Sequence, residues 1–262
     1  SRGDLSKGFI VPRGTMMDSL ALKKTGVTCS YTTAHEVNLL PLKIERIELG
    51  GVPADLPLAQ LGLSQRGISS ALRIRIACDG PQHLGHLDFD RLEFFLSGPD
   101  IEALKLLELV MEHHAGIVCQ TVSKQPQRQL LSSDALRQEG FDADQALLPD
   151  DLRNFDGYRL LQEYFAFPAR FRFISLSGLG KLIQRCEDEK AFDIFVLLDK
   201  SDDQLERVVD ASHMALHCTP VINLFPKVAA RQKLSESQHE YHLVVDNIRP
   251  LDYEIYAVKK IY

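Results

Sequence analysis

The sequence predicts an α+β protein made of two mixed, strand-rich lobes. Segments of alternating apolar and polar residues, which are typical of strands, recur along the chain. Each half contains the order strand–strand–helix–strand, and a polar, turn-rich segment separates the halves. We therefore expect a first lobe at residues 1–122, a connecting segment at 123–156 and a second lobe at 157–262.

The first half contains several segments of strand length and one helix. In ALRIRIAC the apolar side chains share one face of a strand, while Arg73 and Arg75 share the other face, where we expect them to be solvated. Asp100 is expected to cap a helix whose buried stripe begins with Ile101 and Leu104. The elements expected in this half are strands at 29–49, 71–78, 91–98 and 116–122 and a helix near 101–114.

The second half contains the same kinds of element. Asp156 is expected to cap a short helix, which Pro168 prevents from continuing. Ser201 and Gln204 fit a capping box at the start of a later helix. The elements expected here are helices at 157–165 and from 201 to about 213 and strands at 170–176, 192–198 and 218–225.

The two sets of elements lie at a nearly constant offset of about 100 residues. One interpretation is an internal repeat of a strand–strand–helix–strand unit. The alternative is coincidence, because this order is common among α+β proteins. The matched segments are 72–78 with 171–177, 92–98 with 194–200, the helices that start near 101 and 203, and 117–122 with 219–224.

Bulk properties narrow the function classes. The net charge of −6 and the pI of about 5.8 are unfavourable for binding a nucleic-acid backbone, which needs an excess of Lys and Arg on one face. The longest apolar run, residues 194–198, is far shorter than the ~20 residues that cross a bilayer. The five cysteines are widely spaced, without a CxxC pair, as expected for reduced thiols in a cytoplasmic protein.

His217 and Cys218 are the first candidates for chemistry, because a cysteine with a nearby base can act as a nucleophile. Adjacent residues of a strand point to opposite faces, so we expect these side chains not to pair. Free cysteine is also among the most often buried residue types. The sequence therefore favours a structural role for Cys218.

His83, His86 and Asp88 have the residue types of metal ligands, but zinc sites usually show more regular spacing, so a surface turn is favoured. The segment SGLGK at 177–181 lacks the residues that a Walker A phosphate loop requires. We predict no catalytic, cofactor-binding or metal-binding residue. Two other functions stay open: an enzyme that uses Cys218 or the three candidate ligands, and a nucleic-acid binder that uses the arginines at 73–75 and 170–172.

Three stretches in a defined order resemble a known family. They are PRGT at 12–15 followed by CSYTTAHEVNLLPLKI at 29–44, FPARFRFISLSGL at 167–179, and HCTPVINLFPKVA at 217–229 leading into residues 239–261. They are similar to the TssF family, also called VasA or ImpG, of the bacterial type VI secretion system. The segment AARQKLSES at 229–237 departs from the family pattern because it is more polar.

The resemblance implies a non-catalytic baseplate subunit without a cofactor, similar to the wedge proteins of contractile phages. Such a subunit assembles with TssG, in more than one copy per wedge, and engages TssK and TssE around the VgrG spike hub to support tail-sheath assembly. It is cytoplasmic, in a baseplate docked at the inner-membrane complex. Family members are longer and carry an N-terminal helical region, so this chain is expected to be the central and C-terminal part.

A subunit of this kind needs apolar surface that its partners cover. Two segments are candidates for that surface. Phe141, Leu147 and Leu148 lie in the connecting segment, and residues 56–63 form an apolar loop in the first half.

Overall fold

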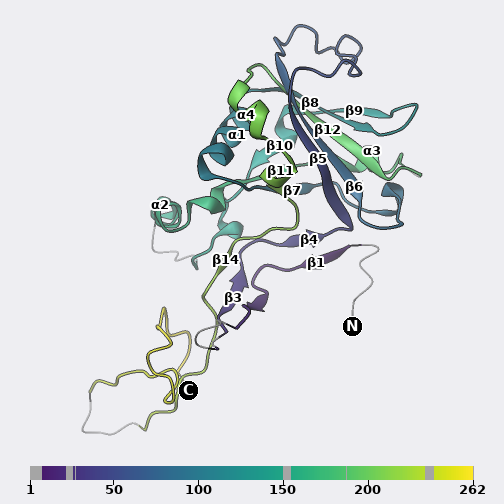
Figure 1. The fold of residues 1–262 in the computed structure, drawn as a ribbon. Coiled ribbons are helices and arrows are strands. Elements are labelled where there is room, and N and C mark those ends of the chain that lie inside the picture. The colour runs from purple at the N-terminus through teal and green to yellow at the C-terminus, as the bar shows by residue number, and fades with distance from the viewer. Residues whose placement is uncertain are drawn as a thin grey trace.

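The computed structural model describes residues 8–21, 26, 28–149, 155–186, 188–233 and 239–261. They form strand-rich sheets, in which every described strand pair is antiparallel, with few helices, which confirms the α+β class (Figure 1). A five-stranded and a four-stranded sheet make up the body, and a two-stranded and a three-stranded sheet lie beside it.

The five-stranded central sheet is antiparallel throughout, and its middle strand, β12 (Ala191–Leu198), is buried on both faces. Along that strand Ile194 and Val196 point into the main core, while Phe195 points into a smaller cluster on the opposite face. The order across this sheet is β5 (Leu42–Gly50), β6 (Ser70–Cys78), β12 (Ala191–Leu198), β8 (His114–Thr121) and β9 (Arg128–Leu131).

The four-stranded sheet shares the main core with the central sheet. Phe94 and Ile174 from this sheet lie in one apolar cluster with Leu72 of the central sheet and with Leu106 of the long helix α1 (Asp100–Glu112). The order across the sheet is β10 (Leu136–Gln138), β11 (Phe173–Leu176), β7 (Leu92–Leu96) and β13 (Met214–Ala215).

The remaining elements are short. The two-stranded sheet pairs β1 (Phe9–Val11) with β4 (Val37–Leu39), and the three-stranded sheet has the order β14 (Val221–Ile222), β3 (Ser30–Thr33) and β2 (Met16–Asp18). Beyond β14 the described residues contain no helix or strand and lie at the end of the molecule far from the central sheet (Figure 1). The other helices are α2 (Asp156–Ala166), α3 (Gly180–Ile183) and α4 (Asp203–Val208), with 3-10 turns at Leu84–His86, Ser133–Ala135, Ala143–Gln145, Pro168–Phe171 and Ala211–His213.

The two strand–strand–helix–strand units are interleaved. In the central sheet, β12 of the second unit lies between β6 and β8 of the first. In the four-stranded sheet, β7 of the first unit lies between β11 and β13 of the second. Each unit therefore supplies the strand that completes the sheet of the other unit.

The shared sheets correct the expected division of the chain. Residues 1–122 and 157–262 are not separate lobes, because each contributes an interior strand to both large sheets, and the expected connecting segment at 123–156 contains β9 and β10. The element order recurs in the two units, and the internal repeat stays a prediction. Its last strand in the second unit is β13, however, and not the expected segment at 219–224.

The stripe expected to be buried on the long helix α1, which continues through Leu107 and Met111, is buried only in its second half, where Leu107 lies in the main core and Met111 packs against it. Ile101 and Leu104 are 72% and 55% exposed, whereas Leu106 and Val110 are fully buried. The helix has apolar residues on more than one side, and contact with the two sheets decides which side is covered. Asp100 is the first residue of the helix and pairs with Arg172 across 3.1 Å, so it is not the cap.

Several other element boundaries differ for local reasons. Asp202, in place of Ser201, caps α4 by accepting hydrogen bonds from the backbone N–H groups of Gln204 and Leu205. Phe155 precedes α2, so Asp156 is its first residue and not its cap. The strand expected at 218–225 is reduced to Val221–Ile222, the strand expected at 170–176 begins at Phe173, and the segment at 29–49 divides into β3, β4 and β5.

Arg73 and Arg75 are not solvated as expected. They reach across to the neighbouring strand β12, where Asp193 is 1% exposed. A guanidinium nitrogen of Arg73 lies 2.6 Å from the Asp193 carboxylate, and one of Arg75 lies 2.8 Å from it. Burial by itself would raise the pKa of Asp193, but the hydrogen bonds and charges of the two arginines outweigh it and hold that pKa below its usual value. The sheet is therefore joined at its centre by a buried carboxylate with two cationic partners.

We expect the Asp193→Asn variant to lose roughly 3 kcal/mol of stability at pH 7, because breaking a buried ion pair leaves its partners uncompensated. Urea unfolding followed by circular dichroism measures this loss. The matched control is Glu48→Gln, which disrupts the exposed pair with Arg46 and should cost less than about 1 kcal/mol. Equal losses in the two variants would contradict the structural weight given to Asp193.

The interleaved topology predicts that the two halves fold only together. If the chain is divided between Ser132 and Ser133, each half lacks an interior strand of both large sheets. Neither half alone should show a cooperative thermal transition, whereas the co-expressed halves should purify as one complex with a single transition. A cooperative transition in either isolated half would contradict this topology.

Candidate functional site

In the described structure, the side chains of His217 and Cys218 contact backbone groups and not each other. His217 has a left-handed backbone with φ of 60°, and its Nε2 atom accepts a hydrogen bond from the backbone N–H of Leu40. Burial lowers the pKa of His217 and raises the pKa of the Cys218 thiol. Cys218 therefore stays a protonated thiol at neutral pH, which is unfavourable for a nucleophile.

The candidate metal ligands lie on an exposed 3-10 turn. The rings of His83 and His86 are 6.0 Å apart between centroids, and Nδ1 of His83 lies 2.8 Å from the carbonyl oxygen of Asp188. Asp88 is exposed beyond that turn. Among the residues that the structure describes, no three His, Cys, Asp or Glu side chains come together in a way that could hold a metal ion.

The glycine-containing segment SGLGK is occupied by a carboxylate of the protein itself. The backbone N–H groups of Gly178 and Gly180 donate hydrogen bonds to the two carboxylate oxygens of Asp90, at 3.2 Å and 2.8 Å. A side chain at Gly180 would meet Asp90 at 2.9 Å. The donors that a phosphate would need are therefore already used by Asp90, and sequence analysis identified the segment without its partner.

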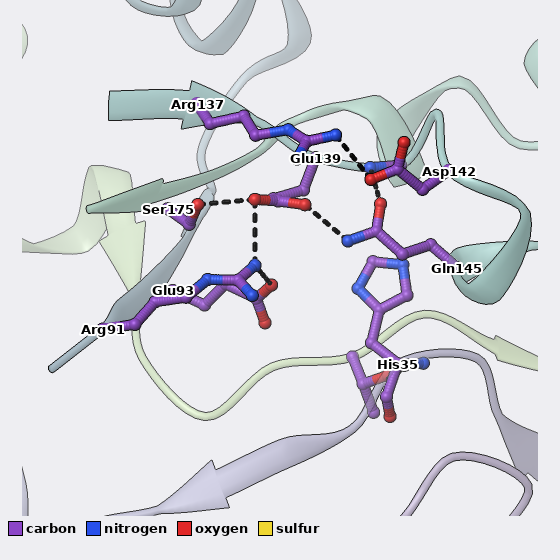
Figure 2. A network of polar contacts seen from close by, with 10 residues as sticks. His35, Arg91, Glu93, Arg137, Glu139, Asp142, Gln145 and Ser175 are labelled. Atoms are coloured by element: carbon purple, nitrogen blue, oxygen red, sulfur yellow. Dashed lines mark hydrogen bonds and ion pairs between the residues drawn. The ribbon is translucent and has the colours of Figure 1, made fainter. Parts of the chain in front are cut away.

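A buried polar network lies where β10, β11 and the chain before β7 meet (Figure 2). Glu139, which is 3% exposed, accepts hydrogen bonds from Ser175 and Gln145 and forms an ion pair of 2.9 Å with Arg91. Glu93 also binds Arg91, at 2.8 Å. Two carboxylates are thus held against one guanidinium group.

Burial shifts the pKa values of two groups in this region in opposite directions. Burial, only partly offset by Arg91, raises the pKa of Glu93 to about 7. Burial and then the charge of Arg170 lower the pKa of His35 to about 4, and neither ring nitrogen of His35 has a hydrogen-bond partner in the described structure. His35 is therefore a neutral, packed side chain at pH 7, in edge contact with Phe173.

A second network attaches α2 to the body through its polar side. Glu163 forms an ion pair with the fully buried Arg170 and accepts hydrogen bonds from the backbone N–H groups of Leu147 and Leu148. Arg170 also donates to the carbonyl oxygens of Gly140 and Gln145, at 2.7 Å and 2.9 Å. The sequence predicted a strand from residue 170 and offered Arg170 for nucleic-acid binding, whereas Pro168 starts a 3-10 turn in which Arg170 is fully buried.

Because its polar side is buried, α2 presents its apolar side to solvent. Glu163 is the residue of α2 that is buried, while Tyr158 and Phe165 are 70% and 80% exposed and Leu161 is 57% exposed. These three positions lie on one stripe of the helix. The usual orientation of an amphipathic surface helix is therefore reversed here.

A groove of about 260 Å³ lies beside this helix. Its lining includes Leu147 and Leu148, which were expected to form partner surface, and both are half-buried. Phe141, also expected there, is 47% exposed. The other lining residues are Gln162, Glu163, Ala166, Phe167, Val221, Ile222 and Asn223.

The apolar loop at 56–63 was wrongly expected to be exposed. Leu56 and Leu63 are 5% and 1% exposed and pack on the outer face of the central sheet against Phe195 and Val118. The loop therefore covers the second face of the sheet. Its apolar residues are explained by this packing within the chain.

An exposed face rich in aromatic side chains, held on a packed, strand-rich body, defines a protein of the kind that binds other proteins. Comparison with known sequences identifies the family. The chain belongs to the TssF family, because the family model described as "Type VI secretion system, TssF" matches residues 1–262. Within the described residues, no helix is both long enough and apolar enough to cross a membrane.

One curated relative and one solved structure are similar to this chain. The type VI secretion system component TssF1 of Pseudomonas aeruginosa strain PAO1 is 38% identical over 264 residues, which cover all of this chain and 42% of that relative. A chain in a cryo-electron microscopy structure of the TssK–TssF–TssG baseplate subcomplex has the same fold, with a TM-score of 0.75 and 24% identity over 94% of this chain and 43% of that one. The chain thus spans less than half the length of the relatives it matches.

The raised pKa of Glu93 predicts a pH effect on stability. The pKa of Glu93 is higher in the folded than in the unfolded state. The stability that Glu93 contributes in its protonated form is therefore fully present below about pH 4.5 and is lost as the pH rises through about 7. Relative to the native protein, Glu93→Gln should gain up to about 3 kcal/mol between pH 5 and pH 8. Urea unfolding at several pH values measures this difference.

The matched control for that experiment is Glu108→Gln on the exposed side of α1, a surface substitution that should change stability by less than about 0.5 kcal/mol. His35 contributes the opposite slope, because its lowered pKa costs stability as the pH falls below about 6.5. That slope is present in every variant and cancels in the comparison. Parallel stability curves for Glu93→Gln and the native protein would contradict the prediction.

Proposed function

We propose that this chain is part of a structural subunit of the type VI secretion system baseplate wedge. Membership of the TssF family over all 262 residues is the observation that carries the proposal. The likeness in fold to a chain of the TssK–TssF–TssG baseplate subcomplex supports it. In this proposal the chain acts by holding partner subunits in place to support tail-sheath assembly.

The partners proposed for the subunit are TssG and TssK, which share the baseplate subcomplex with the chain of similar fold. Contacts with TssE and the VgrG spike hub, and more than one copy in each wedge, are further proposals that rest on the family resemblance alone. The proposed place of work is the cytoplasmic side of the inner membrane, in a baseplate docked at the inner-membrane complex.

The proposed action is binding, without catalysis. The surroundings of the side chains that suggested chemistry support this proposal. Burial raises the pKa of Cys218 and keeps its thiol protonated, and His83 and His86 lie on a surface turn. The proposed function therefore requires interfaces rather than a reactive group.

Complex formation tests this proposal directly. The full-length protein, co-expressed with TssG and TssK from the same organism, should elute as one complex in size-exclusion chromatography, with a mass by light scattering above that of any single subunit. Separate elution of the three proteins would contradict the proposed function.

Substitution of the candidate reactive groups tests the non-catalytic part. Cys218→Ser and the double variant His83→Ala/His86→Ala should still form the complex and still support sheath assembly in cells, measured by fluorescent sheath structures. Loss of sheath assembly by a variant that folds and binds TssG would contradict the non-catalytic proposal.

A further inference from the structure

The two small sheets form a module that only short stretches of chain connect to the body. We call the strands β1, β2, β3, β4 and β14 the peripheral module (Figure 1). Among the described strands, these pair only with one another and not with the two large sheets. In the described part of the chain, the backbone passes between module and body at residues 40–41 and at residues 216–220. A hinge requires only a few such residues at the ends of elements.

His217 ties the two crossings to each other. Its Nε2 atom lies 3.3 Å from the backbone nitrogen of Leu40, and Leu40 is buried in the main core. The left-handed backbone of His217 costs about as much free energy as one hydrogen bond contributes. The crossings therefore attach the module at one place, and contacts away from that place decide whether the module stays docked on the body.

His35 makes the main docking contact of the module. It lies in the turn between β3 and β4, and its ring packs against Phe173 of the four-stranded sheet, with centroids 5.4 Å apart. Figure 2 shows this ring pointing from the turn toward the side chain of Gln145. Arg13, between β1 and β2, adds a second contact by donating to the carbonyl oxygen of Ala146 across 2.6 Å. The module thus rests on the face of the four-stranded sheet that is turned away from the main core.

The polar atoms of His35 oppose the docked state. His35 is 3% exposed, and no group of the described structure forms a hydrogen bond with either ring nitrogen. A buried polar atom without a partner costs free energy, and exposure to water removes that cost. Undocking would therefore solvate both nitrogens while it breaks the ring contact with Phe173. The same side chain contributes to both sides of the balance between the docked and the undocked state.

The surroundings of His35 oppose its protonation while the module is docked. Burial is the largest cause of its low pKa of about 4, followed by the charge of Arg170 in the 3-10 turn before β11. Glu139, after β10, raises this pKa, whereas Arg13 of the module and Arg91, before β7, lower it further. A histidine in water titrates near pH 6.5. Protonation is therefore easier in the undocked state, and acid favours that state.

We propose that His35 is the latch of a hinged module, which is docked against Phe173 while the ring is neutral and is released from the body when the ring takes up a proton. The hinge lies at the two crossings, 40–41 and 216–220. The chain beyond β14 continues from the module, so undocking moves this segment as well (Figure 1). The inference concerns motion within the chain and does not depend on the proposed function.

Single-molecule fluorescence energy transfer in the full-length protein measures the docked and undocked populations. Dyes attached through encoded non-natural amino acids at Asn38 of the module and Glu108 of α1, both exposed, leave the cysteines unlabelled. One population should dominate at pH 7.5. The ratio of a second population to the first should rise roughly thirtyfold between pH 7.5 and pH 5, because His35 titrates near 4 when docked and near 6.5 when undocked.

His35→Phe separates the ring contact from the titration. It keeps an aromatic ring against Phe173 and removes the unpaired nitrogens, so the second population should be smaller than in the native protein and should not grow in acid. His35→Leu should behave in the same way and covers the case that the larger phenyl ring does not fit. The matched control is His86→Phe, the same substitution at an exposed position, which should follow the native protein.

Three results would overturn the inference. A single population of the native protein at pH 5 would exclude the hinge. A rise in His35→Phe and His35→Leu equal to the native rise would exclude His35 as the latch. Loss of the whole circular dichroism spectrum at pH 5 would show that module and body unfold together and do not separate.

Discussion

Strand β12 is the element on which the rest of the body depends. It is buried on both faces and lies between two strands that come more than 70 residues earlier in the chain. Its Asp193 is held by Arg73 and Arg75 from the neighbouring strand, so the register of the sheet centre is fixed by charge as well as by apolar packing. The matching insertion of β7 into the other sheet makes the two units mutually dependent.

This dependence provides a rigid base for the exposed aromatic side of α2. The networks of Glu139 and Arg170 lie at the edge of the four-stranded sheet and fix the chain at 139–148 and the polar side of α2. Ion pairs and hydrogen bonds act here where apolar burial usually would. The apolar side of α2 is consequently exposed.

Sequence patterns predicted the interior strands well because their side chains follow a local rule. Alternation located β6 and the apolar run located β12, and neither depends on knowing the partner strand. The same rule misplaced charged residues. Arg73 and Arg75 were expected in solvent and Arg170 on a strand, yet each meets a buried carboxylate on another element, which the strand pattern does not indicate. The first half of the stripe predicted on α1 was wrong for a related reason, since the helix has apolar residues on more than one side.

The sequence by itself determined the α+β class, the order of most strands and helices in each half and the resemblance to the TssF family. These depend on residue type and short-range spacing. Only the tertiary structure decided that the halves exchange strands, that Asp90 fills the glycine segment and that α2 turns its aromatic side outward. Each of these depends on which distant residue satisfies a buried polar group, and local spacing carries no information about that choice.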